Sequence, residues 1–537
     1  MKFLDKVRGA VSNDKAQKPS LSFGSTTTDQ VALQPPTAQD VLRYRSHHGA
    51  NLGSIFVLEK WLFPSMFETE ARGDSELAAV TASLKKFGVE GTRHRWEQHW
   101  TSALSDAELD RLAFEAGITS LRLPIGYFTF GDRFTNGTPF ATDVAKVYKN
   151  GWDAVLKLCE RLHAVGIGVL LDLHALPGNA NTEDHGGVST RKAELWGNRA
   201  NLALARKCLA FMVSEVAEGK VQGCAGIQLC NEACWGAKGM YQWYESCIQE
   251  IETLDANIPL YVSDAWDLKN TMEWSAQLNR GSGQKCPVGV ATSKYYAFTE
   301  QDKSQSPQQI IERASEELSY VAGTTGQVTD TGAAQVMVTE WSCCMTPDSW
   351  AKASDQDRDK FVRQFGKAQR DEWRRRAGGA FFWTAKMQWM DGGEWGVFEM
   401  MKKGALTPPS SLRLSFDEVR TAAEKARREQ ADCRKRSVDA HTGYWDRTAP
   451  GTAFEHWRFE EGWDLGFTDA LAFFEMRSCG GLVGSRMGAD TIGCVELWIM
   501  KRLRESKQSG GLQWEWEHGF RQGVGTFNDC VLPVDGE

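Results

Sequence analysis

The chain has 537 residues, of which 42% are hydrophobic and 25% charged, and its formal net charge is −8. This composition matches ordinary globular proteins and excludes a wholly disordered, collagen-like or coiled-coil chain. The excess of acidic residues argues against a general nucleic-acid or anionic-membrane binder, because neutralising phosphate groups requires a positive surface.

The first 40 residues are rich in Ser, Thr, Gln, Asp and Pro. They contain too little apolar material to form a helix or strand, so we expect residues 1–40 to be a flexible N-terminal arm. Charges interrupt the few apolar residues of this arm, which argues against a secretory signal. The chain contains no run of about 18 uncharged apolar residues, so its sequence predicts no membrane span. We therefore expect a cytoplasmic protein without a membrane span, whose 13 cysteines are free thiols.

Beyond the arm, eight short apolar runs alternate with helical patterns. Such alternation is typical of parallel strands joined by crossover helices, and strands buried on both faces are near-continuously apolar. Eight units predict an α/β fold, a (β/α)8 TIM barrel, over residues 41–415. A doubly wound sheet is the rival, but residues 51–54 after the first run lack the G-x-G-x-x-G pattern. The predicted strands are 50–58, 120–127, 167–175, 225–233, 259–266, 288–298, 335–341 and 379–387.

The remaining residues, 416–537, are predicted to form a helical, tryptophan-rich C-terminal extension packed on the barrel. Dense charge of both signs over 417–436 indicates a solvated helix rather than a nucleic-acid contact. A docking helix or strand is expected at 514–517, with an aromatic sugar platform as the alternative. An amphipathic helix is indicated by the spacing of Trp457, Phe459, Trp463, Phe467, Leu471 and Phe474.

Two glutamates follow buried apolar runs, Glu232 at the end of the fourth run and Glu340 at the end of the seventh. In an eight-stranded barrel the carboxyl ends of the strands meet at one mouth, where reactive groups gather. An ionisable side chain there is costly to desolvate without partners. One explanation for the two glutamates is that they form ion pairs with arginines of the barrel. Glycoside hydrolysis is the other, because it requires one carboxyl group to protonate the leaving oxygen and a second to attack or to activate water.

Cysteines flank both glutamates, with Cys230 and Cys234 around Glu232, and Cys343 and Cys344 after Glu340. A cysteine nucleophile or a metal site is conceivable, but the chain has no Cys-x-x-Cys or His-Glu-x-x-His pattern. Free cysteine behaves as a small buried hydrophobe, so we interpret these residues as packing residues. We expect neither a metal nor a cofactor.

A series of motifs lies in order between about residues 43 and 400: Gly49-Ala50-Asn51-Leu52-Gly53 with Val57-Leu58-Glu59, Leu121-Arg122-Leu123-Pro124-Ile125-Gly126-Tyr127, Leu171-Asp172-Leu173-His174, Asn231-Glu232, Thr339-Glu340-Trp341 and Phe381-Phe382-Trp383. In this combination the chain resembles glycoside hydrolase family 5, and within it the fungal exo-β-1,3-glucanase-like branch, particularly its intracellular members. The patterns at 454–460 and 514–517 resemble the same proteins.

The resemblance implies a retaining β-glycosidase that hydrolyses a β-glucoside, or another carbohydrate, by double displacement. Glu232 would be the acid/base and Glu340 the nucleophile. Arg122 would keep Glu340 ionised, since a neighbouring cation lowers a carboxyl pKa, and Asn231 would bind the sugar 2-hydroxyl. The other substrate-binding residues that the resemblance implies are Glu59, His174, Asp184, Tyr295 and Trp383, with Ser293 at a position that departs from the family.

Two positions depart from the family pattern. The family has His-x-Tyr at the end of the sixth strand, whereas this chain has Ser293 before Tyr295. Serine has a shorter reach and carries no proton at neutral pH, so hydrolysis is expected to be weakened or redirected. The second departure is His185, where the branch carries asparagine. A barrel redirected to a non-hydrolytic transferase or biosynthetic reaction, and a catalytically weak sugar-binding protein, therefore stay open as alternatives. The sequence indicates no oligomeric state.

Overall fold

The computed structural model describes residues 33–280, 286–323, 325–484 and 487–532. Most of the predicted arm lies outside these ranges, and its last residues already belong to a helix, α2 (Ala38–Tyr44). A capping box starts this helix: the Thr37 hydroxyl accepts the Asp40 backbone N–H at 3.1 Å, and the Asp40 carboxylate accepts the Thr37 backbone N–H at 2.9 Å. The chain thus enters the first strand through a capped helix.

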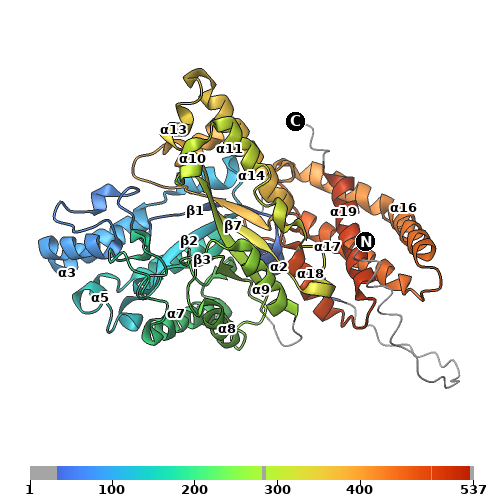
Figure 1. The fold of residues 1–537 in the computed structure, drawn as a ribbon, viewed down its shortest axis with the longest axis horizontal. Coiled ribbons are helices and arrows are strands. Elements are labelled where there is room, and N and C mark those ends of the chain that lie inside the picture. The colour runs from blue at the N-terminus through green and yellow to red at the C-terminus, as the bar shows by residue number, and fades with distance from the viewer. Residues whose placement is uncertain (1–32, 281–285, 324, 485–486, 533–537) are drawn as a thin grey trace. The chain divides into compact units, whose positions relative to one another are not determined.

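Eight parallel strands form a closed barrel in chain order, with β1 also paired to β8 (Figure 1). This confirms the predicted TIM barrel. Every residue of β2 and β3 is buried, as expected where helices cover the outside and side chains fill the inside. The strands are β1 (His47–Asn51), β2 (Ser120–Gly126), β3 (Gly168–Ala175), β4 (Cys224–Gln228), β5 (Leu260–Ser263), β6 (Val288–Tyr296), β7 (Val336–Met345) and β8 (Gly379–Phe382).

The first strand lies earlier than the predicted 50–58. It starts with two polar residues, which an apolar pattern does not detect, but His47 is accommodated because its ring Nδ1 lies 2.7 Å from the Ser120 hydroxyl. The apolar residues after the strand, including Leu52 and Phe56, are buried in the loop that follows. The predicted apolar run therefore corresponds mainly to the buried loop after β1 and not to the strand itself.

Helices follow the strands around the barrel. In α6 (Gly151–Ala164), the buried residues Val155, Leu158, Cys159 and Leu162 recur at helical spacing and form its inner face. The other helices of this region are α3 (Glu76–Ser102), α4 (Asp106–Asp110), α5 (Asp143–Val147), α7 (Arg199–Ala217), α8 (Met240–Ile251), α9 (Leu268–Arg280), α10 (Glu300–Ser304), α11 (Pro307–Ala314), α12 (Val328–Thr331), α13 (Pro347–Trp350), α14 (Arg358–Arg376) and α15 (Val397–Lys402).

The chain divides into two compact units. One unit contains the barrel, residues 37–420, together with residues 473–500. Within this unit, the backbone N–H of Ser46 donates to the Thr491 carbonyl at 2.8 Å, and that of Gly493 donates to the Tyr44 carbonyl at 2.9 Å. The buried Arg477 side chain donates to both carboxylate oxygens of Asp490, at 3.2 and 2.7 Å. A short C-terminal segment therefore belongs to the same unit as the first strand.

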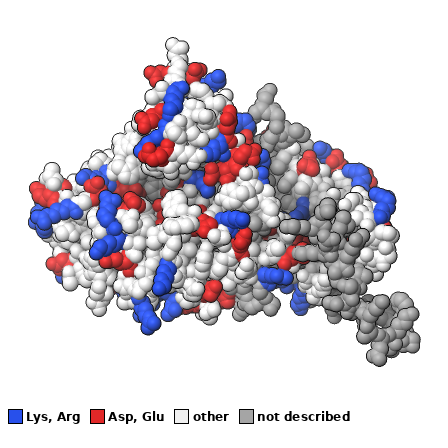
Figure 2. Space-filling view, in the orientation of Figure 1, with Lys and Arg blue, Asp and Glu red and all other residues white. Residues whose placement is uncertain are grey.

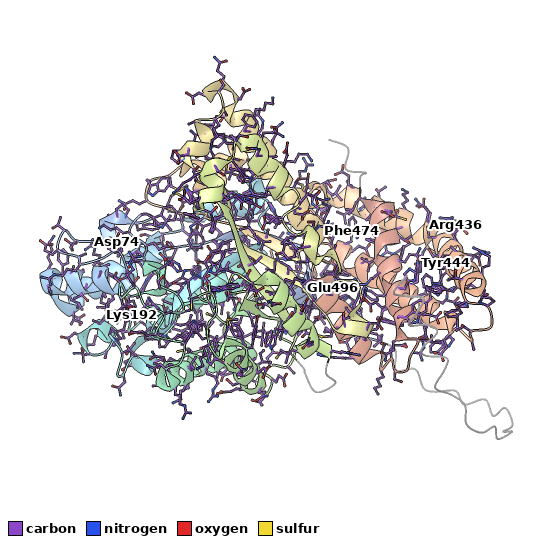
Figure 3. All side chains as sticks on the ribbon, in the orientation of Figure 1. Asp74, Lys192, Arg436, Tyr444, Phe474 and Glu496 are labelled. Atoms are coloured by element: carbon purple, nitrogen blue, oxygen red, sulfur yellow. The ribbon has the colours of Figure 1, made fainter. Side chains whose placement is uncertain are left out.

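The other unit is built, within the described residues, from 33–36, 421–472 and 501–532. The helices of the C-terminal region are α16 (Phe416–Thr448), α17 (His456–Met476), α18 (Val495–Glu505) and α19 (Gln513–Val531). This confirms that the region is helical. Arg436 and Tyr444 lie on α16 (Figure 3), and the Tyr444 side chain is exposed. Trp516 is fully buried in α19, so its ring faces the protein interior rather than offering a sugar platform.

Glycines let α17 and α19 approach each other closely. A Cβ atom on Gly462 or Gly466 of α17 would lie 2.1 or 2.2 Å from a backbone oxygen of α19. Conversely, a Cβ atom on Gly519 or Gly523 of α19 would lie 2.0 or 2.2 Å from a backbone oxygen of α17. Each pair is spaced by four residues, which puts both glycines on one helix face. The two backbones therefore pack directly on each other.

On the face seen in Figure 2, acidic and basic side chains are intermixed over the described residues. None of the helices within the described ranges is both long and apolar enough to cross a membrane.

Candidate active site

A buried arginine connects several strands at the carboxyl end of the barrel. Arg122 of β2 donates from Nη1 to Glu340 Oε1 at 2.8 Å and to Asn51 Oδ1 at 2.9 Å. Its Nη2 donates to Asn231 Oδ1 at 2.7 Å and lies 2.8 Å from Asp172 Oδ2. The guanidinium is fully buried, and two carboxylates offset the cost of burying its charge. Side chains from β1, β3, β7 and the segment after β4 thus meet around one cation.

Glu340 lies within β7 rather than at its end, because β7 continues to Met345. Its Oε2 accepts the Tyr295 hydroxyl at 2.8 Å, while Arg122 holds the other carboxylate oxygen. Burial and the nearby Glu232 raise the pKa of Glu340, and the charge of Arg122 and the Tyr295 hydrogen bond oppose that increase. Both carboxylate oxygens are therefore fixed in position.

Glu232 lies four residues beyond the end of β4. Its φ angle is 39°, in the left-handed region that is strained for a residue other than glycine. The flanking backbone is fixed by Asn181, whose amide donates to the Glu232 carbonyl at 2.9 Å, and by Ser263, whose hydroxyl accepts the Ala233 N–H at 3.0 Å. Burial raises the pKa of Glu232 to about 7, against opposing effects of Ser293 and Arg122. A carboxyl group with that pKa is suited to general acid–base work near neutral pH.

β3 contributes Asp172 and His174, which are two residues apart and so share one face of the strand. His174 Nδ1 lies 2.7 Å from Asp172 Oδ2, and His174 Nε2 lies 3.4 Å from the Asn231 amide nitrogen. Burial lowers the pKa of His174 well below its usual value, so the ring is neutral. With Nδ1–H donated to Asp172, Nε2 accepts from Asn231. The Trp383 ring stacks on His174 at 6.3 Å and 18°.

The two residues that depart from the pattern of the family that the chain resembles, Ser293 and His185, both contact Glu232. Ser293 pairs with Glu340 in the β6–β7 register, and its side chain hydrogen bonds to Glu232. His185, in the short 3-10 helix Asp184–Gly186, has Nε2 3.5 Å from Glu232 Oε2. Burial lowers the pKa of His185, so it stands there as a neutral ring. Its neighbour Asp184 pairs instead with Arg191, at 2.7 Å.

Glu59 lies on the loop after β1, where its Oε2 accepts the Trp61 indole N–H at 2.8 Å. Burial raises the pKa of Glu59 to about 8, and the charges of Glu340 and Glu232 act in the same direction. Trp61 is 42% exposed and packs edge-on against Trp395 at 5.4 Å between ring centroids. Three carboxyl groups therefore share one electrostatic environment beside an aromatic surface.

The structure brings most of the predicted site residues into one connected cluster, which contains Arg122, His174, Asn231, Glu232, Ser293, Tyr295 and Glu340, with Glu59 and Trp383 beside it. Asp184 enters it only through its neighbour His185. Sequence reasoning assigned no role to Asn51, Asp172, Gln228 or Asp264, although each is a polar residue within or directly after an apolar strand. Gln228 accepts from Arg122 Nε at 2.9 Å, and Asp264 accepts the Thr292 hydroxyl at 2.6 Å.

Two of the cysteines beside the glutamates are buried packing residues. Cys230 and Cys343 are fully buried, and burial raises the pKa of both thiols, which keeps them protonated. All thirteen cysteines are free.

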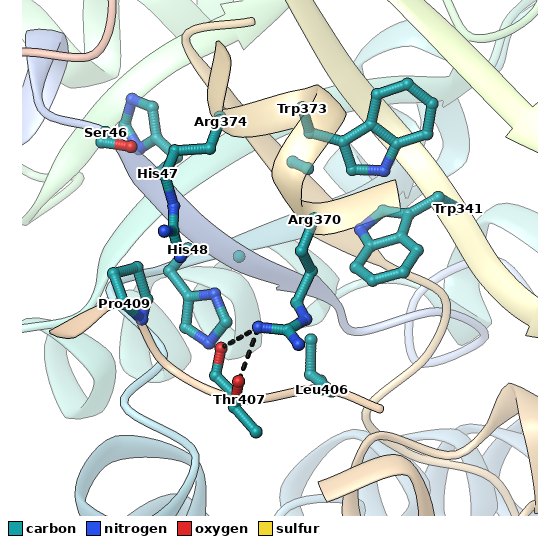
Figure 4. A pocket seen from close by; sticks show the side chains of 13 residues that line it. Ser46, His47, His48, Trp341, Arg370, Trp373, Arg374, Leu406, Thr407 and Pro409 are labelled. Atoms are coloured by element: carbon teal, nitrogen blue, oxygen red, sulfur yellow. Dashed lines mark hydrogen bonds between the residues drawn. The ribbon is translucent and has the colours of Figure 1, made fainter. Parts of the chain in front are cut away.

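A separate pocket lies between α14 and the amino ends of β1 and β8 (Figure 4). Its lining includes His48, Trp341 and Arg370, and Arg370 Nη1 donates to the Thr407 carbonyl at 3.2 Å and hydroxyl at 2.5 Å. The pocket borders the start of these strands, whereas the carboxylate cluster gathers at their other end.

Comparisons with known proteins agree with this fold. Residues 426–531 match the family model described as the glucan 1,3-beta-glucosidase 3 C-terminal domain. An uncharacterized glycosyl hydrolase of Saccharomyces cerevisiae is 29% identical, covering 92% of this chain and 94% of the relative. Glucan 1,3-beta-glucosidase 3 of Schizosaccharomyces pombe is 28% identical, covering 90% and 95%. The crystal structure of rutinosidase from Aspergillus niger has a similar fold, with a TM-score of 0.53, 16% identity and coverage of 68% of this chain and 99% of that chain.

These relatives support the assignment of the chain to the glycoside hydrolases. More narrowly, they relate the chain to the glucan 1,3-beta-glucosidase-like glycosyl hydrolases.

Proposed function

We propose that the protein is a cytoplasmic, retaining β-glycosidase of glycoside hydrolase family 5, in the fungal exo-β-1,3-glucanase-like branch, which hydrolyses a β-glucoside. The observation that carries the proposal is the pairing of Glu232 and Glu340 around Arg122. Both glutamates belong to one electrostatic cluster, but only Glu340 receives a direct hydrogen bond from the guanidinium. Two carboxyl groups in different surroundings are what an acid and a nucleophile require.

In the first step, a Glu340 carboxylate oxygen attacks the anomeric carbon, and the bond from that carbon to the leaving oxygen breaks. Glu232 gives its proton to the leaving oxygen, which departs as an alcohol. In the second step, Glu232 removes a proton from water, and the resulting hydroxide oxygen replaces Glu340 on the anomeric carbon. Arg122 and Tyr295 support this role for Glu340 because they hold both of its oxygens.

The surrounding residues suit a sugar in this position. The Asn231 oxygen is occupied by Arg122, which orients the amide nitrogen as a donor for the sugar 2-hydroxyl. The carboxyl group of Glu59 offers an acceptor for sugar hydroxyls beside the exposed Trp61 ring. The resemblance implies that Trp383 stacks beneath the sugar ring, and its ring lies beside the cluster, stacked on His174.

Ser293 favours a second candidate, transfer of the sugar to an alcohol. Its hydroxyl hydrogen bonds to Glu232 at the position where the family that the chain resembles has a histidine, so the group beside the second-step base differs. An alcohol that reacts in place of water gives a glycoside instead of free glucose, with the same glutamates in the same roles. Assays of aryl β-glycosides with and without added alcohols separate hydrolysis from transfer.

The test uses the full chain and a 2-fluoroglucosyl inhibitor with a good leaving group, followed by peptide mass spectrometry. We expect a covalent adduct on Glu340. Azide should rescue Glu340→Ala as an α-glucosyl azide and Glu232→Ala as a β-glucosyl azide, because azide replaces the nucleophile in one case and the second-step water in the other.

Glu90→Gln is the matched control, because Glu90 is exposed on α3, and it should behave as the parent does. An adduct on another residue, or unchanged turnover of aryl β-glucosides in both alanine variants, would disprove the assignment.

A further inference from the structure

The helical unit formed by residues 421–472 and 501–532 contains a cluster of side chains of the types that bind metal ions. His441 lies on α16, His456 is the first residue of α17, and Glu515 lies near the start of α19. One ligand atom from each residue lies within 4.8 Å of the other two. Three helices of one unit, labelled in Figure 1, therefore direct donor atoms at a common point.

The contacts centre on one oxygen. Glu515 Oε2 lies 3.1 Å from His441 Nε2 and 3.0 Å from His456 Nδ1. Around a tetrahedral zinc ion with bonds of about 2.0 to 2.2 Å, neighbouring ligand atoms lie roughly 3.3 Å apart. These two separations are close to that value, and the ligand atoms of the two histidines lie within 4.8 Å of each other, so side-chain adjustments would allow the three atoms to bind one ion.

The groups behind these ligands are also those of a metal site. His456 Nε2 lies 3.1 Å from Asp446 Oδ1, which suits a histidine that binds metal through Nδ1 and donates its other N–H to a carboxylate. Glu515 Oε1 accepts the backbone N–H of Glu455 at 2.8 Å, which fixes the carboxylate and leaves Oε2 toward the histidines. Phe459 stacks on His441 with ring centroids 4.0 Å apart and holds the imidazole in place.

The charges favour a bound cation. The Glu515 side chain is 0% exposed, and the ion-pairing partners seen for it within the described chain are the two histidines. A divalent ion held by His441, His456 and Glu515 would place a positive charge beside this buried carboxyl group.

We propose that His441, His456 and Glu515 form a binding site for a zinc ion that joins α16, α17 and α19. The set of two imidazoles and one carboxylate is one that zinc accepts, and it leaves a fourth position for water. His456 is partly exposed, which gives the ion a path from solvent. The absence of a Cys-x-x-Cys or His-Glu-x-x-His pattern did not predict this site, because its three residues lie 15 and 59 residues apart and form no short motif.

The experiment uses the full chain without a histidine tag, stripped with a chelator and then reloaded with zinc chloride. Metal content is measured by mass spectrometry after gel filtration, and the midpoint of thermal unfolding is measured with and without zinc. We expect one zinc ion per chain and a higher unfolding midpoint in its presence, because an ion that binds only the folded state stabilises it. A parent chain that retains no zinc, or whose unfolding midpoint zinc leaves unchanged, overturns the proposal.

Variants separate the site from adventitious binding. His456→Gln should hold no zinc, whereas the control His94→Gln, which changes an exposed histidine on α3, should hold one ion. Asp446→Asn changes an exposed residue behind the site and should weaken zinc affinity by about 10- to 100-fold while leaving the fold unchanged. If His456→Gln fails to fold, Asp446→Asn decides the question. Zinc affinity equal to the parent in Asp446→Asn and zinc content equal to the parent in a folded His456→Gln are the results that contradict the proposal.

Discussion

His185 Nε2 lies 3.5 Å from Glu232 Oε2, so a residue that departs from the family pattern stands beside the proposed catalytic acid. Burial lowers the pKa of His185, so its neutral ring can orient the proton of the Glu232 carboxyl group without adding a charge to the site. We predict that His185→Asn lowers kcat for substrates with poor leaving groups, and by less than the roughly 100-fold that loss of a general acid costs.

Substrates with good leaving groups provide the internal control, because they need little protonation. The measurement is a series of aryl β-glucosides of graded leaving-group pKa. An equal loss on all members of the series would mean that His185 supports binding or folding rather than proton transfer.

The raised pKa of Glu232 predicts a pH dependence of catalysis. The first step requires the protonated form, and burial raises the pKa of Glu232 to about 7. kcat/KM for aryl glucosides with poor leaving groups should therefore fall as pH rises through about 7. A pH profile of the parent measures this limb. Persistence of the same limb in Glu232→Gln, tested on an activated substrate, would assign it to another group.

Glu59 predicts a pH dependence of stability. Its pKa is raised by burial to about 8, so the folded state binds a proton more tightly than the unfolded chain does. The stability that this group contributes is therefore fully present below the ordinary carboxyl pKa and is lost as pH rises through about 8. Thermal unfolding from pH 4 to 9 should show a flatter decline for Glu59→Gln than for the parent. Parallel curves would contradict the prediction.

The close packing of α17 on α19 predicts a large cost for adding one methyl group. A Cβ atom on Gly519 would lie 2.0 Å from the Phe459 carbonyl oxygen, so Gly519→Ala forces the helices apart and should destabilise the protein by about 1–3 kcal/mol.

Gly525→Ala is the control on the same helix. Nothing lies within 4 Å of its added Cβ, so alanine should stabilise α19 by about 0.5–1 kcal/mol. Urea unfolding followed by tryptophan fluorescence measures both variants, and similar effects of the two would show that the helices are not in contact there.

The buried ion pairs of Arg122 predict that lysine is a poor replacement. Lysine keeps the charge but lacks the planar fork that reaches Glu340, Asn231 and Asp172 together. Arg122→Lys should lose most activity and lower the free energy of unfolding. Arg420→Lys, in an exposed pair with Asp417, should change neither. A fully active Arg122→Lys variant would show that the network is dispensable.

The barrel could be predicted from the sequence because buried parallel strands are apolar and regularly spaced. The same signal failed at β1, where His47 satisfies its polar ring by hydrogen bonding to Ser120, from a different strand. It also misplaced Glu340, which lies within β7 because the strand continues through five further residues, to Met345. An apolar run indicates which residues are buried, and burial continues beyond the ends of the strands.

The sequence predicted only part of the candidate site. Ionisable residues at strand ends marked Glu232 and Glu340, but the contact between His185 and Glu232 depends on a loop whose path no pattern specifies. The roles of Asp172 and Asn51 depend on Arg122, which lies on the strand between theirs. These contacts form only in the closed barrel, so no local sequence pattern predicts them.

The guanidinium of Arg122 takes hydrogen-bond acceptors from β1, β4 and β7, from the loop after β4, and a carboxylate from β3. A shift of one residue in the register of any of these strands would move a hydrogen-bond acceptor out of reach of Arg122. The geometry of the proposed active site is therefore tied to the closure of the whole barrel, so a partly opened chain should have no residual turnover rather than a reduced rate.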